Sequence, residues 1–523
     1  MVRQLGIIDL FIVAVYLLAM VAMGIYFSRR NRSIDLFTRA AGKIPQWAVG
    51  LSMYATFLSS NTFLGVPGKA FGSDWNYFVF SLSMPIAAWI ATRYFIPFYR
   101  SSGEISAYTH FEKRFGVWAR QYAVICFLLT QLARMGSIFF GVALTMQVLT
   151  GLSLQSIIIS TGLIIIIYTL LGGIQAVIWT EVAQAFIKTA GAILILIVIW
   201  NSIPGGITSI LETAKSADKL SLGSLKPDFT ISSFWVVLLY GICINLNNFG
   251  MDQNYVQRYH VTGSAKDAAS SVWLCVKLYV PVSLLFFMIG TSLYAWYQLH
   301  PEMIDAIRIR VVEAGLRSHA TPKQVSQLAA SLQPQDYGDK ILPDFMARML
   351  PTGLIGLLVA AILSAAMSTI SSGINASATV FTVDIYNRFR KRSLSSAGAF
   401  RIVLAATLIV GLLSIFAGLA LIGVTSILDT WWQLSGIFAA GMLGLFLLSL
   451  VSRHTGNIEA LLATIVGILV IAWMTFSSLI PLRYSFLRSQ FNANMIIVIG
   501  TLSIFLAGVL FTGIRAKKMH KSV

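Results

Sequence analysis

Residues 51–69 read LSMYATFLSSNTFLGVPGK, an apolar stretch that also carries hydroxyl and amide side chains and several helix-breaking residues. The polar residues are Ser59, Ser60, Asn61 and Thr62, and the helix breakers are Gly65, Pro67 and Gly68. In the hydrocarbon core of a membrane, a backbone group freed by a helix break must be satisfied by protein, ion or trapped water. The stretch therefore predicts a discontinuous membrane helix whose freed groups face a small polar cargo. A polar helix face that hydrogen-bonds to neighbouring helices is the alternative.

The composition of the whole chain is that of a membrane protein. Hydrophobic residues make up 57% of the 523 residues and charged residues only 11%. Apolar stretches of about 20 residues, the length that crosses a bilayer, predict one all-α polytopic domain with about 13 transmembrane helices. The predicted spans are residues 7–26, 46–66 (broken), 76–98, 122–149, 154–171, 182–200, 234–251 (broken), 271–296, 354–385, 402–421, 431–450, 458–480 and 495–512.

The positive charges of the chain fall mostly in alternate connections between these spans. The clusters are Arg29/Arg30/Arg32/Arg39/Lys43, Arg100/Lys113/Arg114/Arg120, Arg258/Lys266, Arg388/Arg390/Lys391/Arg392, Arg453 and Arg515/Lys517/Lys518/Lys521. The net charge of +18 therefore reflects the positive-inside rule and not a nucleic-acid partner. It predicts a multi-pass protein of the plasma membrane, in bacteria the inner membrane, with its N-terminus outside and its C-terminus in the cytoplasm.

A second interruption is predicted in residues 241–259, which read GICINLNNFGMDQNYVQRY. It lies five spans after the first, and two interrupted spans at matching positions indicate inverted repeats around a shared site. We expect an extra N-terminal span (7–28), a first repeat (46–201), a second repeat (234–450), two C-terminal spans (458–512) and a basic tail (513–523). The long segment 297–351 is either a structured extracellular lid or a plain connector.

A third informative stretch, residues 358–386, is rich in serine and threonine. Ser368, Ser371 and Ser372 share one helical face, and Thr369 flanks it. The face is either a small-residue packing surface or a site for a hard cation such as sodium. Calcium would want more carboxylates than this stretch offers.

Ionisable residues inside spans are costly and point to function. Arg134 pairs with a neighbouring carboxylate or presents its guanidinium to an anionic substrate group. Lys277 either extends to the inner membrane surface or contacts the substrate. Glu181 opens a span, where a helix N-terminus favours a carboxylate; it is also a candidate charge near a second cation, unless Lys188 neutralises it.

Motifs for ATP hydrolysis, metal-dependent catalysis and serine hydrolysis are absent from the sequence, and its six histidines are scattered. Its three cysteines lie in apolar stretches, as small buried thiols do. We therefore expect a protein that is not an enzyme.

Three motifs resemble the sodium:solute symporter family in the same order along the chain. They are GGIQAVIWTEVAQ (172–184), DQNYVQRY (252–259) and MSTISSGINASATVFTVDIY (367–386). Within that family, ATFLSSNTF, VIWTEV and VQRYHVT are most similar to bacterial sialic acid/sodium symporters. The resemblance implies a fold of five-plus-five inverted repeats with broken first and sixth core helices, like that of amino-acid transporters, and alternating access by rocking.

The resemblance also implies site residues and a coupling ion. The first sodium ion would bind the carbonyls of Ala55, Leu58 and Ala365 and the hydroxyls of Ser368 and Thr369. A second would lie near Ser368, Ser371, Ser372 and Glu181, where the family usually has aspartate. The substrate pocket would contain Ser59, Ser60, Thr62, Tyr77, Ser81 and Arg134. The chain differs from the sialic acid branch at Phe57 and Ser81, where that branch has a hydroxyl and an amide.

Together these features predict a monomeric sodium-coupled symporter that imports a small polar solute, best a carboxylated sugar such as sialic acid. A symporter for a neutral sugar or another organic anion is the alternative within the class. A channel or a transporter-derived sensor is the alternative from a different class.

Overall fold

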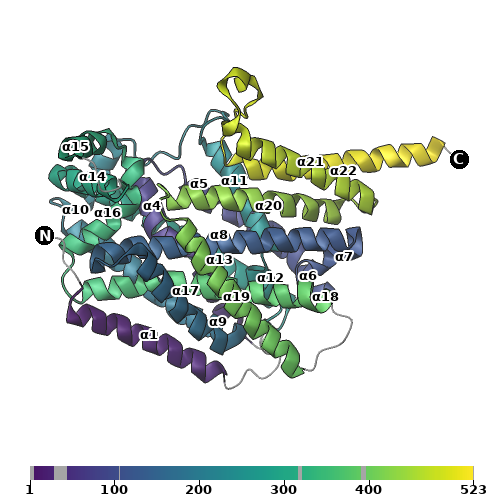
Figure 1. Cartoon of the computed structure of the whole chain (residues 1–523), viewed down its shortest axis with the longest axis horizontal. Coiled ribbons are helices and arrows are strands. Elements are labelled where there is room, and N and C mark those ends of the chain that lie inside the picture. Colours follow the sequence, from purple (N-terminus) through teal and green to yellow (C-terminus); the bar gives the residue numbers. More distant parts are fainter. Residues whose placement is uncertain (1–4, 29–43, 105, 316–320, 390–395, 522–523) are drawn as a thin grey trace.

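The computed structural model describes residues 5–28, 44–104, 106–315, 321–389 and 396–521, and this part of the chain is almost entirely helical. Most long helices lie side by side in Figure 1, and the short helices α10, α14, α15 and α16 gather at one end of the bundle. The long helices are α1 (Ile7–Ser28), α8 (Val117–Thr150), α9 (Leu154–Asn201), α13 (Ala265–Gln298), α17 (Leu354–Val380), α19 (Ser396–Ala420), α20 (Ile427–Val451), α21 (Asn457–Phe476) and α22 (Met495–Lys521). The shorter ones are α3 (Gln46–Phe57), α4 (Ser60–Gly72), α5 (Phe78–Ile90), α6 (Ile96–Ser102), α7 (Thr109–Phe115), α10 (Gly206–Ser216), α11 (Phe234–Met251), α12 (Gln253–Tyr259), α14 (Pro301–Gly315), α15 (Pro322–Ser331), α16 (Pro334–Met349) and α18 (Asn387–Phe389). Two π-helical turns, η2 (Ala91–Phe95) and η3 (Phe381–Tyr386), and two 3₁₀ turns, η4 (Ser477–Leu479) and η5 (Leu482–Leu487), complete them.

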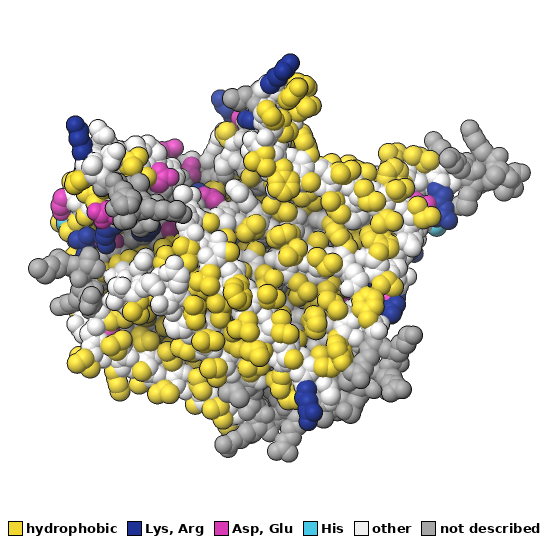
Figure 2. Space-filling view, viewed as in Figure 1, with side chains coloured by type: hydrophobic (Ala, Val, Ile, Leu, Met, Phe, Trp, Pro, Cys, Tyr) yellow, Lys and Arg dark blue, Asp and Glu magenta, His cyan; other side chains and the backbone are white. Residues whose placement is uncertain are grey.

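Eleven helices in the described part of the chain are long and apolar enough to cross a membrane. The other two predicted crossings are the broken pair α3 and α4 and the shorter apolar run Leu154–Leu170. That run does not form a separate helix, because α9 is continuous over the predicted spans 154–171 and 182–200. The flank of the bundle in Figure 2 is largely covered by hydrophobic side chains, and most charged side chains lie at its two ends. This distribution is the one that a lipid bilayer imposes.

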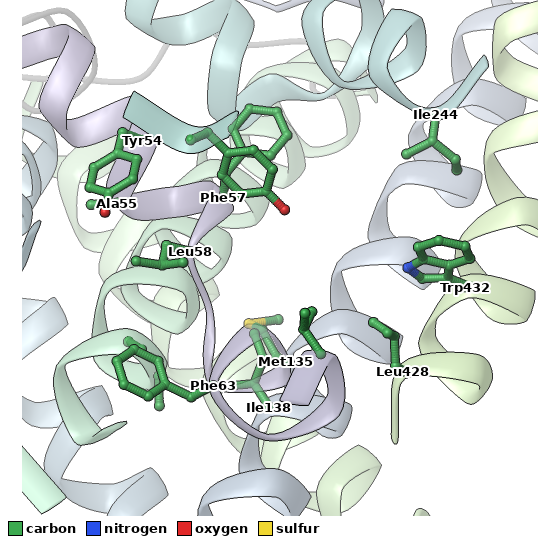
Figure 3. Close-up of a cluster of buried hydrophobic side chains, with 14 of the residues drawn as sticks. Tyr54, Ala55, Phe57, Leu58, Phe63, Met135, Ile138, Ile244, Leu428 and Trp432 are labelled. Carbon is green, nitrogen blue, oxygen red and sulfur yellow. The ribbon is translucent and has the colours of Figure 1, made fainter. Parts of the chain in front are cut away.

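The first predicted interruption lies at Leu58 and Ser59. Helix α3 ends at Phe57 and α4 begins at Ser60, and Ser59 between them is fully extended, with φ −99° and ψ 177°. Figure 3 shows the chain leaving the helix at Phe57 and running past Leu58 as non-helical backbone. The discontinuous helix is therefore present.

The expected helix breakers do not make this interruption. Gly65, Pro67 and Gly68 all lie inside helix α4, which continues through them. The glycines instead permit close packing: a Cβ atom on Gly68 would meet the backbone carbon of Gly338 at 2.8 Å, and one on Gly290 of α13 would clash with the Pro67 carbonyl oxygen. Gly68 and Pro67 thus lie at the contacts of α4 with α16 and α13, and Gly65 lies at its contact with Leu428 of α20.

The second predicted interruption lies at Asp252, between α11 and α12. Asp252 has φ −76° and ψ 115°, outside the helical region, and its Oδ1 accepts the backbone N–H of Asn254 at 2.9 Å. The carboxylate therefore caps the N-terminus of α12, where a negative charge is favoured.

The serine-rich helix α17 lies at the centre of the bundle. Its side chains are buried from Leu358 to Val380, and it packs against α1, α3, α8, α9 and α19. A helix surrounded on all sides has its hydroxyl groups available only to protein, ion or cargo.

The segment 297–351 is structured in its described part. It contains α14, α15 and α16, and the buried face of α16 packs against α4. The Asp339 carboxylate of α16 accepts the backbone N–H of Ile427 at 2.8 Å, at the start of α20.

Candidate functional site

A cavity lies between the two interrupted helices and helices α5, α8, α13 and α20. Five of the predicted substrate residues line it: Ser59, Thr62, Tyr77, Ser81 and Arg134. The sixth, Ser60, does not reach the cavity, because its hydroxyl turns to α8 and donates to the Ile138 carbonyl at 3.2 Å. Ser60 thus anchors the start of α4.

One wall of the cavity is aromatic and aliphatic. Figure 3 shows Phe57 on one side of the space and Ile244, Leu428 and Trp432 on the other. The Tyr77 ring stacks on Trp432, with ring centroids 4.5 Å apart and an interplanar angle of 24°. Trp432 also stacks on Tyr240, with ring centroids 4.6 Å apart, so the three rings form an aromatic stack beside the cavity.

The Phe57 position carries part of this wall. Its ring packs against Tyr255 at 4.6 Å and Tyr279 at 5.4 Å, centroid to centroid. The family resemblance implies a hydroxyl side chain at this position in the sialic acid branch. This chain instead has Phe57, which packs in an aromatic cluster.

Two of the residues that line the cavity carry amide oxygens that no described protein group satisfies. The amide oxygens of Asn61 and Asn247 are buried and have no hydrogen-bond partner in the described part of the chain, and both residues line the cavity. A buried unpaired acceptor is costly unless a ligand or water supplies a donor. The Asn61 amide is turned toward α8, where its Nδ2 donates to the Ser137 hydroxyl at 2.8 Å, so its unpaired oxygen belongs to the α4–α8 contact.

Arg134 of α8 carries the positive charge of the cavity. Its Nη2 donates to the Thr56 carbonyl at 3.0 Å, one of the groups near the first break. Its Nη1 lies 3.4 Å from Oδ2 of Asp252, the residue at the second break. A good charged hydrogen bond is shorter, about 2.7–2.9 Å. Arg134 thus contacts both helix breaks, and its contact with the Asp252 carboxylate is longer than a good charged hydrogen bond.

The residues predicted for the first sodium ion do converge, but around a lysine. The Lys188 Nζ of α9 donates to the Ala55 carbonyl at 2.5 Å, to the Leu58 carbonyl at 2.8 Å and to the Ser368 hydroxyl at 3.0 Å. These three oxygen atoms are called the inner cation site below. Ala365 is adjacent, because its carbonyl accepts the hydroxyl of Ser368 at 3.1 Å. The Thr369 hydroxyl lies within hydrogen-bond distance of the same Ala365 carbonyl, at 3.2 Å.

The residues predicted for a second sodium ion converge only in part. Glu181 Oε1 accepts the Ser372 hydroxyl at 2.5 Å and lies 3.2 Å from the Thr56 hydroxyl. The Ser371 hydroxyl instead donates to the Ser368 carbonyl at 3.3 Å, within its own helix. A guanidinium group completes the set: Arg258 Nη2 lies 2.7 Å from Glu181 Oε2.

Three expectations about charged residues are wrong. Glu181 lies in the middle of α9 and not at a helix start. Its charge is matched by Arg258 and not by Lys188, whose amine is engaged at the inner cation site. Arg258 is not a loop residue, because it lies in α12 with 1% of its side-chain surface exposed. Lys277 is exposed and does not line the cavity, as expected for a side chain that extends to the membrane surface.

The most important residues that the sequence did not assign are Asp252, Lys188 and Arg258. Each had a signal: Lys188 is a charged residue inside an apolar span, and Asp252 and Arg258 flank the second interruption. Among the described residues there is no cluster of three or more His, Cys, Asp or Glu side chains that could hold a metal ion. Any cation in this region would depend mainly on carbonyl and hydroxyl oxygens.

A bundle of membrane-spanning helices with two interrupted helices around a central polar cavity defines a secondary transporter and not an enzyme. The family model of the sodium:solute symporter family matches residues 37–467. The chain therefore belongs to the sodium:solute symporter family, and its sequence motifs indicated this correctly.

Individual relatives agree with this assignment. The sodium/sialic acid symporter of Proteus mirabilis is 32% identical over 97% of this chain and 95% of the relative. A solved Na⁺-coupled sialic acid symporter, in a substrate-bound outward-open state, has a TM-score of 0.83 at 32% identity, over 97% of this chain and 98% of its own. Mhp1, a nucleobase-cation-symport-1 family transporter solved in a closed conformation, has a TM-score of 0.51 at 14% identity, over 92% and 95%, and shows the fold alone. The predicted transporter fold is thus confirmed.

Proposed function

We propose that the protein is a sodium-coupled symporter that imports a small carboxylated sugar of the sialic acid type. The observation that carries the solute class is Arg134, a guanidinium group in the wall of the central cavity beside both helix breaks. The similarity to sodium/sialic acid symporters over nearly the full chain supports the same solute.

The contacts of Arg134 suit the binding and release of a carboxylate. Guanidinium groups bind carboxylates through two parallel hydrogen bonds. Arg134 now has a backbone carbonyl at 3.0 Å and the Asp252 carboxylate at 3.4 Å, so a solute carboxylate could replace the looser partner. The side chains of Ser59, Thr62 and Asn247, which line the cavity, would bond to sugar hydroxyls, and the aromatic side chains of its wall would contact the apolar parts of the sugar.

Coupling to sodium supplies the driving force in this proposal. Each sodium ion that enters down the membrane potential contributes about 2.3 kcal/mol per 100 mV. We place the N-terminus outside and the C-terminus in the cytoplasm, so that uptake is inward. The repeats 46–201 and 234–450 of a single monomer would rock around the cavity, with the extra span and the C-terminal spans beside them.

A symporter for a neutral sugar or another organic anion is the second candidate. The neutral sugar is favoured by one observation, that Arg134 already has a carboxylate partner in Asp252. A neutral solute would then bind without separating this pair.

Uptake by purified protein in liposomes distinguishes the candidates. We expect sodium-driven accumulation of labelled sialic acid that carboxylated sugars inhibit more strongly than neutral sugars. Arg134→Ala should reduce uptake at sub-saturating solute at least ten-fold, because loss of charged hydrogen bonds of about 1.5–3 kcal/mol reduces affinity by at least an order of magnitude. Lys277→Ala, at an exposed lysine outside the cavity, is the matched control. Equal uptake of labelled sialic acid by Arg134→Ala and the wild type would refute the assignment of Arg134 as the group that binds the carboxylate, and equal inhibition by neutral and carboxylated sugars would favour the neutral-sugar candidate.

A further inference from the structure

We propose that Lys188 is the chain's own cation at the inner cation site, so that its ammonium group and a sodium ion are alternative occupants of one oxygen cage. The inference deepens the sodium coupling proposed above and rests on it. It assigns to Lys188 the role of a tethered competitor of the transported ion.

The geometry of the ammonium group carries the proposal. An ammonium group has three N–H donors and no acceptor. The Lys188 Nζ has three acceptors at 2.5, 2.8 and 3.0 Å, the carbonyls of Ala55 and Leu58 and the hydroxyl of Ser368. Lys188 has no exposed surface, so water does not compete for these bonds. Its donors are therefore fully used by the oxygens that would bind sodium.

The two carbonyls belong to the first helix break and are freed by it. Helix α3 ends at Phe57, so the carbonyls of Ala55 and Leu58 lie where the hydrogen-bond ladder stops. A freed carbonyl in a membrane protein needs a donor or a cation. Lys188 of α9 donates to these carbonyls and also to the Ser368 hydroxyl of α17. The lysine therefore connects α3, α9 and α17.

A sodium ion and the ammonium group cannot share the cage. Both would be positive and within hydrogen-bond distance of the same oxygens, in an interior where like charges repel strongly. Sodium therefore binds there only after the Lys188 side chain has left. Beyond the three oxygens of the inner cation site, the Ala365 carbonyl and the Thr369 hydroxyl would then also be near the ion.

The predicted second sodium position shows the same substitution independently. The Arg258 guanidinium lies 2.7 Å from Glu181 Oε2, 2.8 Å from the Ser52 hydroxyl and 2.7 Å from the Ser372 hydroxyl. In the described part of the chain, both positions expected to hold sodium thus hold a side-chain cation.

Sodium titration of Lys188→Met tests the proposal. Purified wild type and K188M are titrated with sodium chloride at constant ionic strength, with choline as the replacement cation, and thermal stability is recorded. We expect K188M to reach half-maximal stabilisation at a sodium concentration at least ten-fold lower than the wild type, since its cage has no competing charge. Lys277→Met, at an exposed lysine outside the cavity, should titrate as the wild type does.

The outcomes separate this inference from the proposed function. A folded K188M whose half-saturating sodium concentration equals or exceeds that of the wild type overturns the inference, whatever solute is transported. A wild type without sodium response beside a sodium-responsive K188M supports it, and removes sodium coupling at this site from the proposed function. Should K188M be unstable, Lys188→Gln, which keeps N–H donors for the carbonyls, is titrated in the same way and judged by the same criterion.

Discussion

Removing the guanidinium group of Arg258 should destabilise the protein severely. Arg258 has 1% and Glu181 0% of its side-chain surface exposed, and the two charged groups lie 2.7 Å apart. In Arg258→Met, Glu181 keeps the hydroxyl of Ser372 at 2.5 Å but loses its counter-charge. Breaking a buried ion pair by removing one partner costs about 3–5 kcal/mol. We expect a loss of this size in the free energy of unfolding.

The double variant Glu181→Gln/Arg258→Met makes this test specific. It leaves no unpaired charge, so the loss should be smaller than the sum of the two single losses, with a coupling of about 0.5–3 kcal/mol. The assay is equilibrium unfolding in mixed micelles followed by tryptophan fluorescence. Additive losses, or an Arg258→Met variant as stable as the wild type, would refute the assignment of Arg258 as the counter-charge of Glu181.

Two further predictions concern the contact of α16 with the transmembrane bundle. Burial raises the pKa of Asp339 from 3.8 to about 6, so the folded state binds this proton more tightly than the unfolded state does. Protonation of Asp339 therefore stabilises the folded state. The stabilisation is complete below pH 3.8 and is lost as the pH rises through 6. Melting temperatures between pH 4.5 and 7.5 should therefore fall more with pH in the wild type than in Asp339→Asn, and parallel profiles would contradict this. Gly68→Ala should lower the melting temperature, because its Cβ would meet Gly338 at 2.8 Å and such overpacking costs about 1–3 kcal/mol. Gly513→Ala, where a Cβ has nothing within 4 Å, should not.

The bilayer explains why most of the fold was predictable from the sequence. Spans must be apolar and of a fixed length, so composition alone located them. Polar residues inside such spans are rare, so runs such as Ser59–Thr62 and Asn245–Asn248 marked the two interrupted helices. The same constraint pointed to Arg134.

The partners of the buried charges were not predictable in this way. Glu181 and Arg258 are 77 positions apart, and Lys188 and Ala55 are 133 positions apart, so no local pattern connects them. Helical periodicity showed that Ser368 and Ser372 share a face, but not which cation approaches that face. The sequence also could not show that Pro67 and its neighbouring glycines lie inside α4 and serve helix packing, whereas the break lies at Leu58 and Ser59.

The contact between α4 and α16 joins the interrupted crossing to a part of the protein outside the bundle. A Cβ on Gly68 would lie 2.8 Å from the Gly338 backbone and from Oδ1 of Asp339, so the two helices are in direct contact there. We therefore expect a tilt of α4 to displace α16 as well. A fluorescent label on the exposed side of α16 would report the motion of a helix that is itself buried beyond the reach of dyes.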